Sequence, residues 1–370
     1  PNNVDFSRLK QWMSACEREH RCVDDSGSQN CFPGTRLIDC KTRRVVRAGD
    51  DTNGSALAYV ALSYVWGPSS SASLAFPISK PGRLRGDLSS HELPEQLPRT
   101  IEDAILAVLK LGMQYLRVDK YCIDQADHTG KEEHIRNMDK IYQNASATIV
   151  ACAGSDSEYG LPGVSGVSRT LQLSSKTTGG TFVSALPALP SVLKASVWAT
   201  RGWIYQEAIL SRRLIFFTDF QVYASCVSLQ AECRLWCESH TSPLMIQKPQ
   251  FTSRGLFLDR NVDLTQLGTS DSGTLRRIQE HIAEYSKRQL SFDSDALNAF
   301  SGILAKSSCY SYFGIPFLEE PDIFISAILR ARKRSFVMGL FWRRNRQAQG
   351  TLCRRRGFPS WSWVGWTGAV

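Results

Sequence analysis

The sequence predicts an α/β fold, with a mostly parallel central sheet, flanking helices and a helical, loop-rich C-terminal part. Three short apolar runs, at residues 59–66, 115–118 and 147–152, have the length and composition of buried strands. Amphipathic helical segments separate these runs, so the order is strand, helix, strand, helix, strand. That order implies parallel strands joined by right-handed crossovers, with ligands bound beyond the carboxyl ends of the strands.

Local signals mark where the first strand and the first helix end. Gly67 and Pro68 close the run YVALSYVW, and such a pair commonly ends a buried strand. The next helix should begin with Thr100 as its N-cap and Asp103 three residues later. We expect it to end at Gly112, because glycine accepts the left-handed conformation of a helix C-terminus.

The rest of the chain alternates regular and irregular segments. The expected elements are, in order, a helix at 135–145, loops and edge strands at 161–197, a short helix at 203–210, a hairpin at 214–218 and 221–226, and amphipathic helices at 271–289 and 295–306.

These elements suggest three regions along the chain. They are an N-terminal extension at 1–56, an α/β core at 57–226, and a C-terminal extension at 227–370 that packs on the core. The tail supports such packing, because Trp361, Trp363 and Trp366 are too apolar to be left in water.

Composition excludes several classes of protein. A chain of 370 residues with 42% hydrophobic residues fills a core, so global disorder is excluded. Eleven cysteines, an odd number in a chain much larger than disulfide-dependent secreted domains, indicate a reduced protein. No stretch approaches the roughly 18 apolar residues of a membrane span, and the N-terminus lacks the apolar segment of a signal peptide. We therefore expect a cytoplasmic protein, whose sequence starts at an internal boundary because Met is missing.

The charge balance is basic, with 44 Lys and Arg against 35 Asp and Glu. Part of the excess lies in three runs near the C-terminus, at 330–334, 343–346 and 354–356. Such runs could meet phosphates or acidic lipids. Because we find no aromatic interleaving and no nucleic-acid motif, we interpret them as a solvated face and do not expect a nucleic-acid partner.

Four separated segments resemble, in the same order, the heterokaryon incompatibility (HET) family of fungi. They are YVALSYVWG (59–67), LPRTIEDAILAVLKLGMQYLRVDKYCIDQ (97–125), MDKIYQNASATIVACAGSDSEYGLPGV (138–164) and WATRGWIYQEAILSRRLIFF (198–217). The family more often has Trp at the position of Arg117 and Ser or Leu near Lys120. The segments at 285–304 and 358–368 are similar to the C-terminal extension of one HET subfamily.

The resemblance implies a role in fungal non-self recognition and programmed cell death. The domain is thought to be distantly related in fold to the TIR module, whose enzymatic members cleave NAD. The resemblance therefore predicts a TIR- or flavodoxin-like core and makes NAD a candidate substrate, with no cofactor required. The alternative is a non-catalytic module that triggers cell death through an unknown activator or incompatibility partner, with self-association as one route.

Polar and aromatic residues follow the first two strands, where a ligand is expected. Tyr64 and Trp66 could stack on a nicotinamide or adenine ring, and Ser63 could hold a phosphate or a ribose hydroxyl. Asp119 and Asp124 lie just beyond the second strand, so at least one should face the crevice. The alternative is that the aromatic residues belong to the core and that the two acids cap a helix or close a turn.

The short helix at 203–210 carries the main candidate acid. Its opening turns bring together Arg201, Trp203, Gln206 and Glu207. A carboxylate partly buried against Trp could hold the nicotinamide ribose and stabilise the oxocarbenium-like transition state of N-glycosidic cleavage, while Arg201 could bind the diphosphate. The alternative is an ion pair of Glu207 with Arg201 or Arg212 that anchors the helix.

Three further signals are weaker. Glu132 and Glu133 begin the second helix and are reserve candidates for the catalytic acid, although glutamates at a helix start commonly interact with the helix dipole. Cys122 lies between the two aspartates, but the only neighbouring bases are His128 and His134. The spacings of the Cys and His clusters at 16–40 and 226–240 do not fit paired Cys-x2-Cys sites, so we predict no metal.

Overall fold

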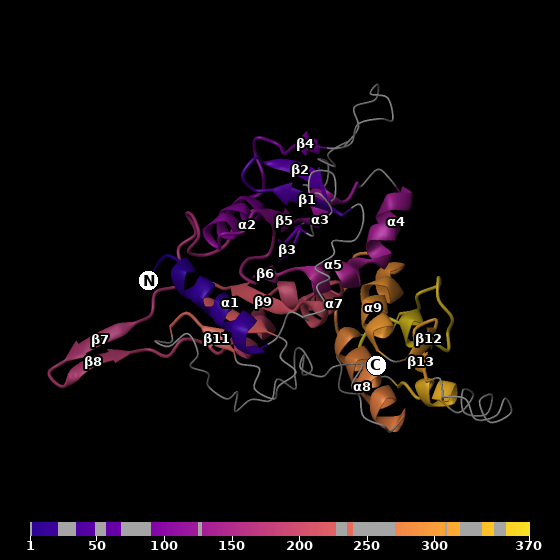
Figure 1. Ribbon diagram of the computed structural model, residues 1–370. Helices are drawn as coiled ribbons and strands as arrows, with labels where there is room; N and C mark the ends of the chain where they lie inside the picture. Colours follow the sequence, from indigo (N-terminus) through magenta and orange to yellow (C-terminus); the bar gives the residue numbers. More distant parts are fainter. Residues whose placement is uncertain are drawn as a thin grey trace. The chain divides into compact units, whose positions relative to one another are not determined.

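The chain divides into two compact units in the computed structural model (Figure 1). The structure describes residues 2–20, 35–48, 57–67, 90–124, 128–226, 235–239, 271–307, 309–318, 335–343 and 353–370. The first unit comprises Pro1–Trp198 and Ser211–Gln250, and the second comprises Ala199–Leu210 and Phe251–Val370. The chain therefore leaves the first unit after Trp198, contributes one segment to the second unit, and returns at Ser211.

A nine-stranded sheet forms the centre of the first unit. From one edge to the other its strands are β11 (Trp236–Cys237), β10 (Val222–Cys226), β9 (Arg213–Phe217), β6 (Ala147–Ala151), β3 (Tyr59–Ser63), β5 (Tyr115–Arg117), β1 (Arg36–Asp39), β2 (Arg44–Arg47) and β4 (Ser90–Glu92). The four inner strands β9, β6, β3 and β5 run parallel. The predicted adjacency of the three apolar runs is thus confirmed.

The prediction of a mostly parallel sheet is wrong, because antiparallel pairs flank the parallel centre on both sides. In the described sheet, five of the eight neighbouring pairs are antiparallel and three are parallel. The predicted hairpin at 214–226 is confirmed as β9 and β10. A second hairpin, β1 and β2, arises where the Asp39 carboxylate accepts the backbone N–H of Lys41 at 2.9 Å and Arg43 adopts a φ of 56°.

Helices surround the sheet of the first unit. They are α1 (Phe6–His20), α2 (Arg99–Lys110), α3 (Asp119–Cys122), α4 (His128–Arg136), α5 (Met138–Asn144) and α6 (Leu189–Ala195). Leu9 of α1 and Ile105 of α2 join one buried cluster with Val60, Ile149 and Ile215 of the parallel strands. Since alternate strand residues face the same side, α1 and α2 cover one face of the sheet.

The start of α2 differs from the predicted capping box. The helix begins at Arg99, and its N-cap is Pro98. The Thr100 hydroxyl instead accepts the backbone N–H of Gly160 at 3.0 Å. Asp103 accepts the N–H of Leu161 at 2.7 Å, so both side chains hold the loop after β6. The predicted end of the helix is confirmed, because Gly112 follows the C-cap with a φ of 83°.

A separate hairpin in the first unit is formed by β7 (Ser174–Thr177) and β8 (Gly180–Val183). It lies within the segment predicted to hold loops and edge strands. Figure 1 shows it extending away from the nine-stranded sheet. Every residue of both strands is exposed.

The second unit is built from helices and a small hairpin. Its elements are α7 (Ile204–Leu210), α8 (Asp271–Tyr285), α9 (Asp295–Lys306), β12 (Tyr310–Tyr312), β13 (Ile315–Phe317) and the 3-10 turn η3 (Trp363–Gly365). Another 3-10 turn, η2 (Trp198–Thr200), lies where the chain enters this unit. The predicted helices at 203–210, 271–289 and 295–306 are confirmed, with the second ending four residues early.

Aromatic rings fill the core of the second unit. The ring of Tyr285 lies 5.1 Å from that of Phe300 and 5.8 Å from that of Trp363, measured between centroids. Trp363 is buried as expected, but Trp361 is exposed, so the expectation that the whole tail avoids water is wrong. Within the described residues, no helix is long and apolar enough to cross a bilayer.

The sheet also includes strands from outside the predicted core. β1 and β2 come from the segment assigned to an N-terminal extension, and β11 comes from the segment assigned to the C-terminal extension. The three predicted regions remain a prediction.

Candidate functional site

The end of β3 presents an aromatic pair. The rings of Tyr64 and Trp66 stack with centroids 6.4 Å apart and planes 25° apart. Tyr64 is buried, whereas Trp66 is 40% exposed. The pair therefore offers one accessible aromatic face at the carboxyl end of a parallel strand, where α/β sheets bind ligands.

Ser63, the last residue of β3, has its hydroxyl engaged inside the first unit. Its Oγ accepts a hydrogen bond from the indole Nε1 of Trp198 at 2.8 Å. Trp198 is itself fully buried and meets Phe216 edge to face at 6.1 Å. This bond ties the end of β3 to the residue at which the chain leaves the first unit.

A buried cation lies at the end of β5. Arg117 is 1% exposed, and its Nη1 donates to the carbonyls of Arg36 at 3.0 Å and Cys122 at 3.3 Å. Its Nε lies 3.5 Å from the carboxylate of Asp119, which begins α3 and stays 19% exposed. Arg117 thus holds β1, β5 and α3 together. Its positive charge is paired with the carboxylate of Asp119.

The remaining predicted residues near α3 have different surroundings. Cys122 is fully buried, and burial raises the pKa of its thiol, so it stays protonated at neutral pH. That state opposes a role as nucleophile. Asp124 is half-buried just after α3. Glu133 belongs to α4, but its side chain lies outside the described part of the structure.

The loop after β6 approaches the same edge of the sheet. The Ser157 hydroxyl donates to the carbonyl of Trp66 at 3.1 Å. A Cβ on Gly67 would come within 2.9 Å of the Cβ of Asp156, so only glycine permits this approach at a φ of 94°.

Glu158 and Tyr121 also belong to this edge, although no pattern in the sequence indicates them. Burial, together with the charges of Glu158 and Glu102, raises the pKa of Tyr121 to about 12. Carboxylates from the loop after β6 and from α2 therefore act on the phenol of α3. No local pattern could reveal this, because the three segments meet only through the parallel order of β6, β3 and β5.

The predicted residues of the short helix lie in the second unit. Trp203 donates its Nε1 to the carboxylate of Asp295 at 3.0 Å, and Gln206 Oε1 accepts the N–H of Gly302 at 3.2 Å. Both bonds join the α7 segment to α9. Arg201 forms a β-bridge with Gln289, so the backbone before α7 is also fixed.

Glu207 lies on α7 and is 7% exposed. Arg212 belongs to the first unit, where it is half-buried before β9. The predicted site residues are thus divided, with Arg201, Trp203, Gln206 and Glu207 in the second unit and the others in the first. Their convergence on one cleft, and the alternative ion pairs of Glu207, stay predictions.

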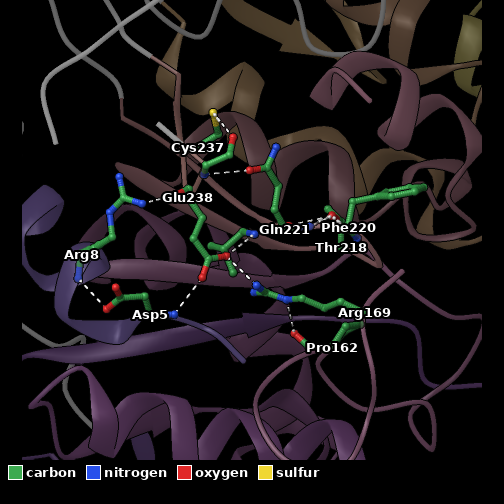
Figure 2. Close-up of polar contacts among 11 residues, drawn as sticks. Asp5, Arg8, Pro162, Arg169, Thr218, Phe220, Gln221, Cys237 and Glu238 are labelled. Carbon is green, nitrogen blue, oxygen red and sulfur yellow. Dashed lines mark hydrogen bonds and ion pairs between the residues drawn. The ribbon is translucent and has the colours of Figure 1, made fainter. Parts of the chain in front are cut away.

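A second polar cluster of the first unit surrounds Glu238 (Figure 2). The carboxylate of Glu238 accepts the Nη1 of Arg169 at 2.8 Å and the backbone N–H groups of Asp5 at 2.8 Å and Val222 at 3.2 Å. Arg169 also donates its Nε to the carbonyl of Pro162 at 3.3 Å. This cluster joins the N-terminal segment, the loop after β6 and the β10–β11 hairpin, which identifies it as structural.

The described residues contain no group of three or more His, Cys, Asp and Glu placed to hold a metal ion. Several members of the two Cys and His clusters, including Cys22, Cys31, Cys233 and His240, lie outside the described residues.

Comparison with known families identifies the central part of the chain. Residues 59–207 match the family model described as "Heterokaryon incompatibility protein (HET)". No curated protein and no solved structure matched the chain. The match begins at the first residue of β3 and ends at Glu207, so it includes the aromatic pair, Asp119 and the opening turns of α7. Over residues 59–207, this chain is therefore similar to the heterokaryon incompatibility (HET) family.

Proposed function

We propose that this chain acts in fungal heterokaryon incompatibility, as a cytoplasmic module that triggers programmed cell death after non-self recognition. The family match over residues 59–207 carries this proposal. Expression from an inducible promoter in a fungal host should arrest growth. Fusion to a chemically inducible dimerising tag tests whether self-association is the trigger. Unimpaired growth at high expression, both with and without forced dimerisation, would contradict an intrinsic death activity.

We further propose that the chain hydrolyses NAD to nicotinamide and ADP-ribose. In this reaction the bond between the nicotinamide nitrogen and the ribose C1′ breaks, water supplies a hydroxyl to C1′, and a proton is released. Positive charge develops on the ribose in the transition state, and a fixed carboxylate stabilises it most strongly where water is excluded. Glu207, an almost fully buried acid within the family match, fits that requirement.

Other residues also suit NAD as the substrate. The exposed face of Trp66, stacked on Tyr64, suits a nicotinamide or adenine ring. Asp119 is accessible and held by Arg117, so it suits a ribose hydroxyl or an attacking water. Arg201 is the candidate for the diphosphate. The four parallel inner strands support a TIR- or flavodoxin-like core, which is part of the same proposal.

Release of nicotinamide from NAD by the purified chain is the decisive measurement. It should be repeated at high protein concentration, so that activity requiring self-association is not missed. Wild-type protein that releases no nicotinamide under either condition would exclude the hydrolase.

A non-catalytic signalling module is the second candidate, and the hairpin of β7 and β8 favours it. Leu173 and Phe182 are 77% and 67% exposed. The hydrogen bonds between Leu173 and Ser184, together with the pairing of Ser175 with Phe182, place both side chains on one face of the hairpin. An isolated hairpin is marginally stable in water, and its unpaired edges are templates for another strand. We infer that this hairpin supports self-association.

A further inference from the structure

The second unit exposes a set of large apolar side chains, here called the apolar tip. Each keeps between 41% and 69% of its surface in solvent. The members are Tyr310, Tyr312, Phe313, Val337, Met338, Phe341 and Trp361. Seven such residues in one unit of a water-soluble fold require an explanation, because large exposed apolar patches mark interaction sites.

Ring contacts join three members of the apolar tip, Tyr312, Phe313 and Trp361, into one aromatic cluster. Tyr312 stacks on Trp361 with centroids 5.8 Å apart and planes 12° apart, and Phe313 meets Trp361 edge on at 6.0 Å. Phe336, which is half-buried, contacts both Tyr312 at 6.4 Å and Trp361 at 6.3 Å. Three segments of the chain, distant in sequence, therefore meet in this cluster.

Hydrogen bonds hold these segments in place. The side chain of Gln279 on α8 donates to the carbonyl of Met338 at 3.0 Å. The Ser335 hydroxyl donates to the carbonyl of Leu318 at 3.3 Å, and the Trp363 indole donates to the carbonyl of Gly314 at 2.8 Å. The apolar tip is thus presented by an anchored scaffold, and its exposure is built into the unit.

In the sequence, residues 335–343 lie between basic runs at 330–334 and 343–346, and the acids Glu319, Glu320 and Asp322 precede these runs. Residues 323–370 contain ten Lys and Arg and no Asp or Glu. Arg343 follows Phe341 by two residues and is itself exposed. The basic runs were interpreted as a solvated face without aromatic neighbours, whereas the structure has exposed Phe341 two residues before exposed Arg343.

We propose that the second unit docks on an anionic lipid membrane through the apolar tip. Phe341, Met338 and Val337 would enter the boundary between headgroups and acyl chains, and the tryptophan and tyrosine rings suit the headgroup level. The exposed Arg343 would meet the negatively charged headgroups beside Phe341. Such binding is peripheral and is independent of NAD hydrolysis.

Single-stranded nucleic acid is another polyanion that binds basic and aromatic residues. The apolar tip suits it less well than it suits a membrane. Nucleobases stack on flat rings. Met338 and Val337 are aliphatic and highly exposed, and they offer no such face. Lipid accepts aliphatic and aromatic side chains equally, so the composition of the apolar tip favours a membrane.

Vesicle flotation of the full chain tests the proposal. Vesicles of phosphatidylcholine with about 30% phosphatidylserine should bind the protein at about 0.1 M salt, and vesicles of phosphatidylcholine alone should bind it much less. The double variant Met338→Ser/Phe341→Ser should weaken binding about tenfold, equivalent to about 1.4 kcal/mol. An unchanged thermal melt verifies that the variant folds.

A matched variant controls for the loss of apolar surface in general. Val197→Ser/Phe292→Ser removes two side chains outside the apolar tip that are 43% and 68% exposed, close to the 48% and 69% of Met338 and Phe341, and it should bind vesicles as wild type does. Absence of flotation, equal binding to neutral vesicles, or an equal loss in both double variants would overturn the proposal. So would binding of a single-stranded oligonucleotide, but not of vesicles, that is lost in Met338→Ser/Phe341→Ser.

Discussion

The hydroxyl of Tyr205 lies 2.8 Å from Nδ1 of His281, and this contact joins α7 to α8 in the core of the second unit. Both residues are buried. Tyr205 stacks on Phe300 at 6.4 Å and carries the Arg288 guanidinium 4.3 Å above its ring. Burial, reinforced by Arg277, lowers the pKa of His281 to about 4. The imidazole is therefore neutral in the folded protein at physiological pH.

We expect the stability of the second unit to fall in mild acid because of His281. An unfolded histidine has a pKa of about 6.5, so between that value and about 4 the unfolded state binds the extra proton. The stabilising contribution is complete above pH 6.5 and disappears as the pH falls toward 4. The free energy of unfolding should decrease by about 2 kcal/mol between pH 7 and pH 5 from this group.

Urea unfolding of His281→Gln at the two pH values measures this contribution. Gln keeps an acceptor for Tyr205 but does not titrate. The variant should therefore lose less stability between pH 7 and pH 5 than the wild-type protein does. Identical losses in the two proteins would exclude His281 as the source.

The buried ion pair of Arg169 and Glu238 should contribute strongly to the first unit. Glu238→Ala leaves the Arg169 charge and two backbone N–H groups without their acceptor, which costs about 3–5 kcal/mol. The exposed pair of Arg276 and Glu280 is the control, and Glu280→Ala should cost about 0.5 kcal/mol or less. Thermal or urea unfolding would contradict this prediction if both variants lost equal stability.

Glu207→Gln should abolish NAD hydrolysis and leave the fold intact. Gln keeps the volume and one acceptor but removes the charge, and the loss of one electrostatic stabiliser reduces the rate about 100-fold or more. Nicotinamide release is compared with that of Glu280→Gln, which removes an exposed charge on α8, outside residues 59–207. If Glu207→Gln turned over NAD like wild type, the catalytic role would pass to Glu133 or Asp119.

Self-association through the β7–β8 hairpin predicts a face-specific effect. Leu173→Ser/Phe182→Ser should shift the chain toward monomer in light scattering, because both residues lie on the same face. Lys176→Ser changes the opposite face and should leave the association constant unchanged. A monomeric wild type at all concentrations, or equal effects of the two variants, would exclude the hairpin as the contact.

Sequence patterns predicted what depends on local order and missed what depends on distant contacts. The apolar runs and their turn signals were sufficient for β3, β5 and β6. The β1–β2 hairpin was not predicted, because its strands RLID and RVVR are short and contain charged residues. Both strands nevertheless lie inside the sheet. Thr100 satisfied the capping pattern, yet a loop sixty residues away uses its hydroxyl.

Distant contacts also limited the prediction of the candidate site. Residues at strand ends could be named, because their position follows from the strand itself. The partner of Ser63 is Trp198, 135 residues later, and no spacing rule connects them. The closeness of Asp156 to Gly67 likewise depends on two loops that meet only in the folded sheet.

The return of the chain at Ser211 has a consequence for synthesis on the ribosome. All seven residues of α7 are buried, yet α8 and α9 of the same unit are synthesised only with residues 271–306. At about 5–20 residues per second, α7 waits about 5–20 s for these helices after Leu210 has been added. During that interval α7 has no packing partner from its own unit. It lies in the chain between β6 and β9, which can already pair in the sheet of the first unit. Slower elongation beyond residue 210 should therefore increase chaperone capture of the nascent chain and lower the yield of folded protein.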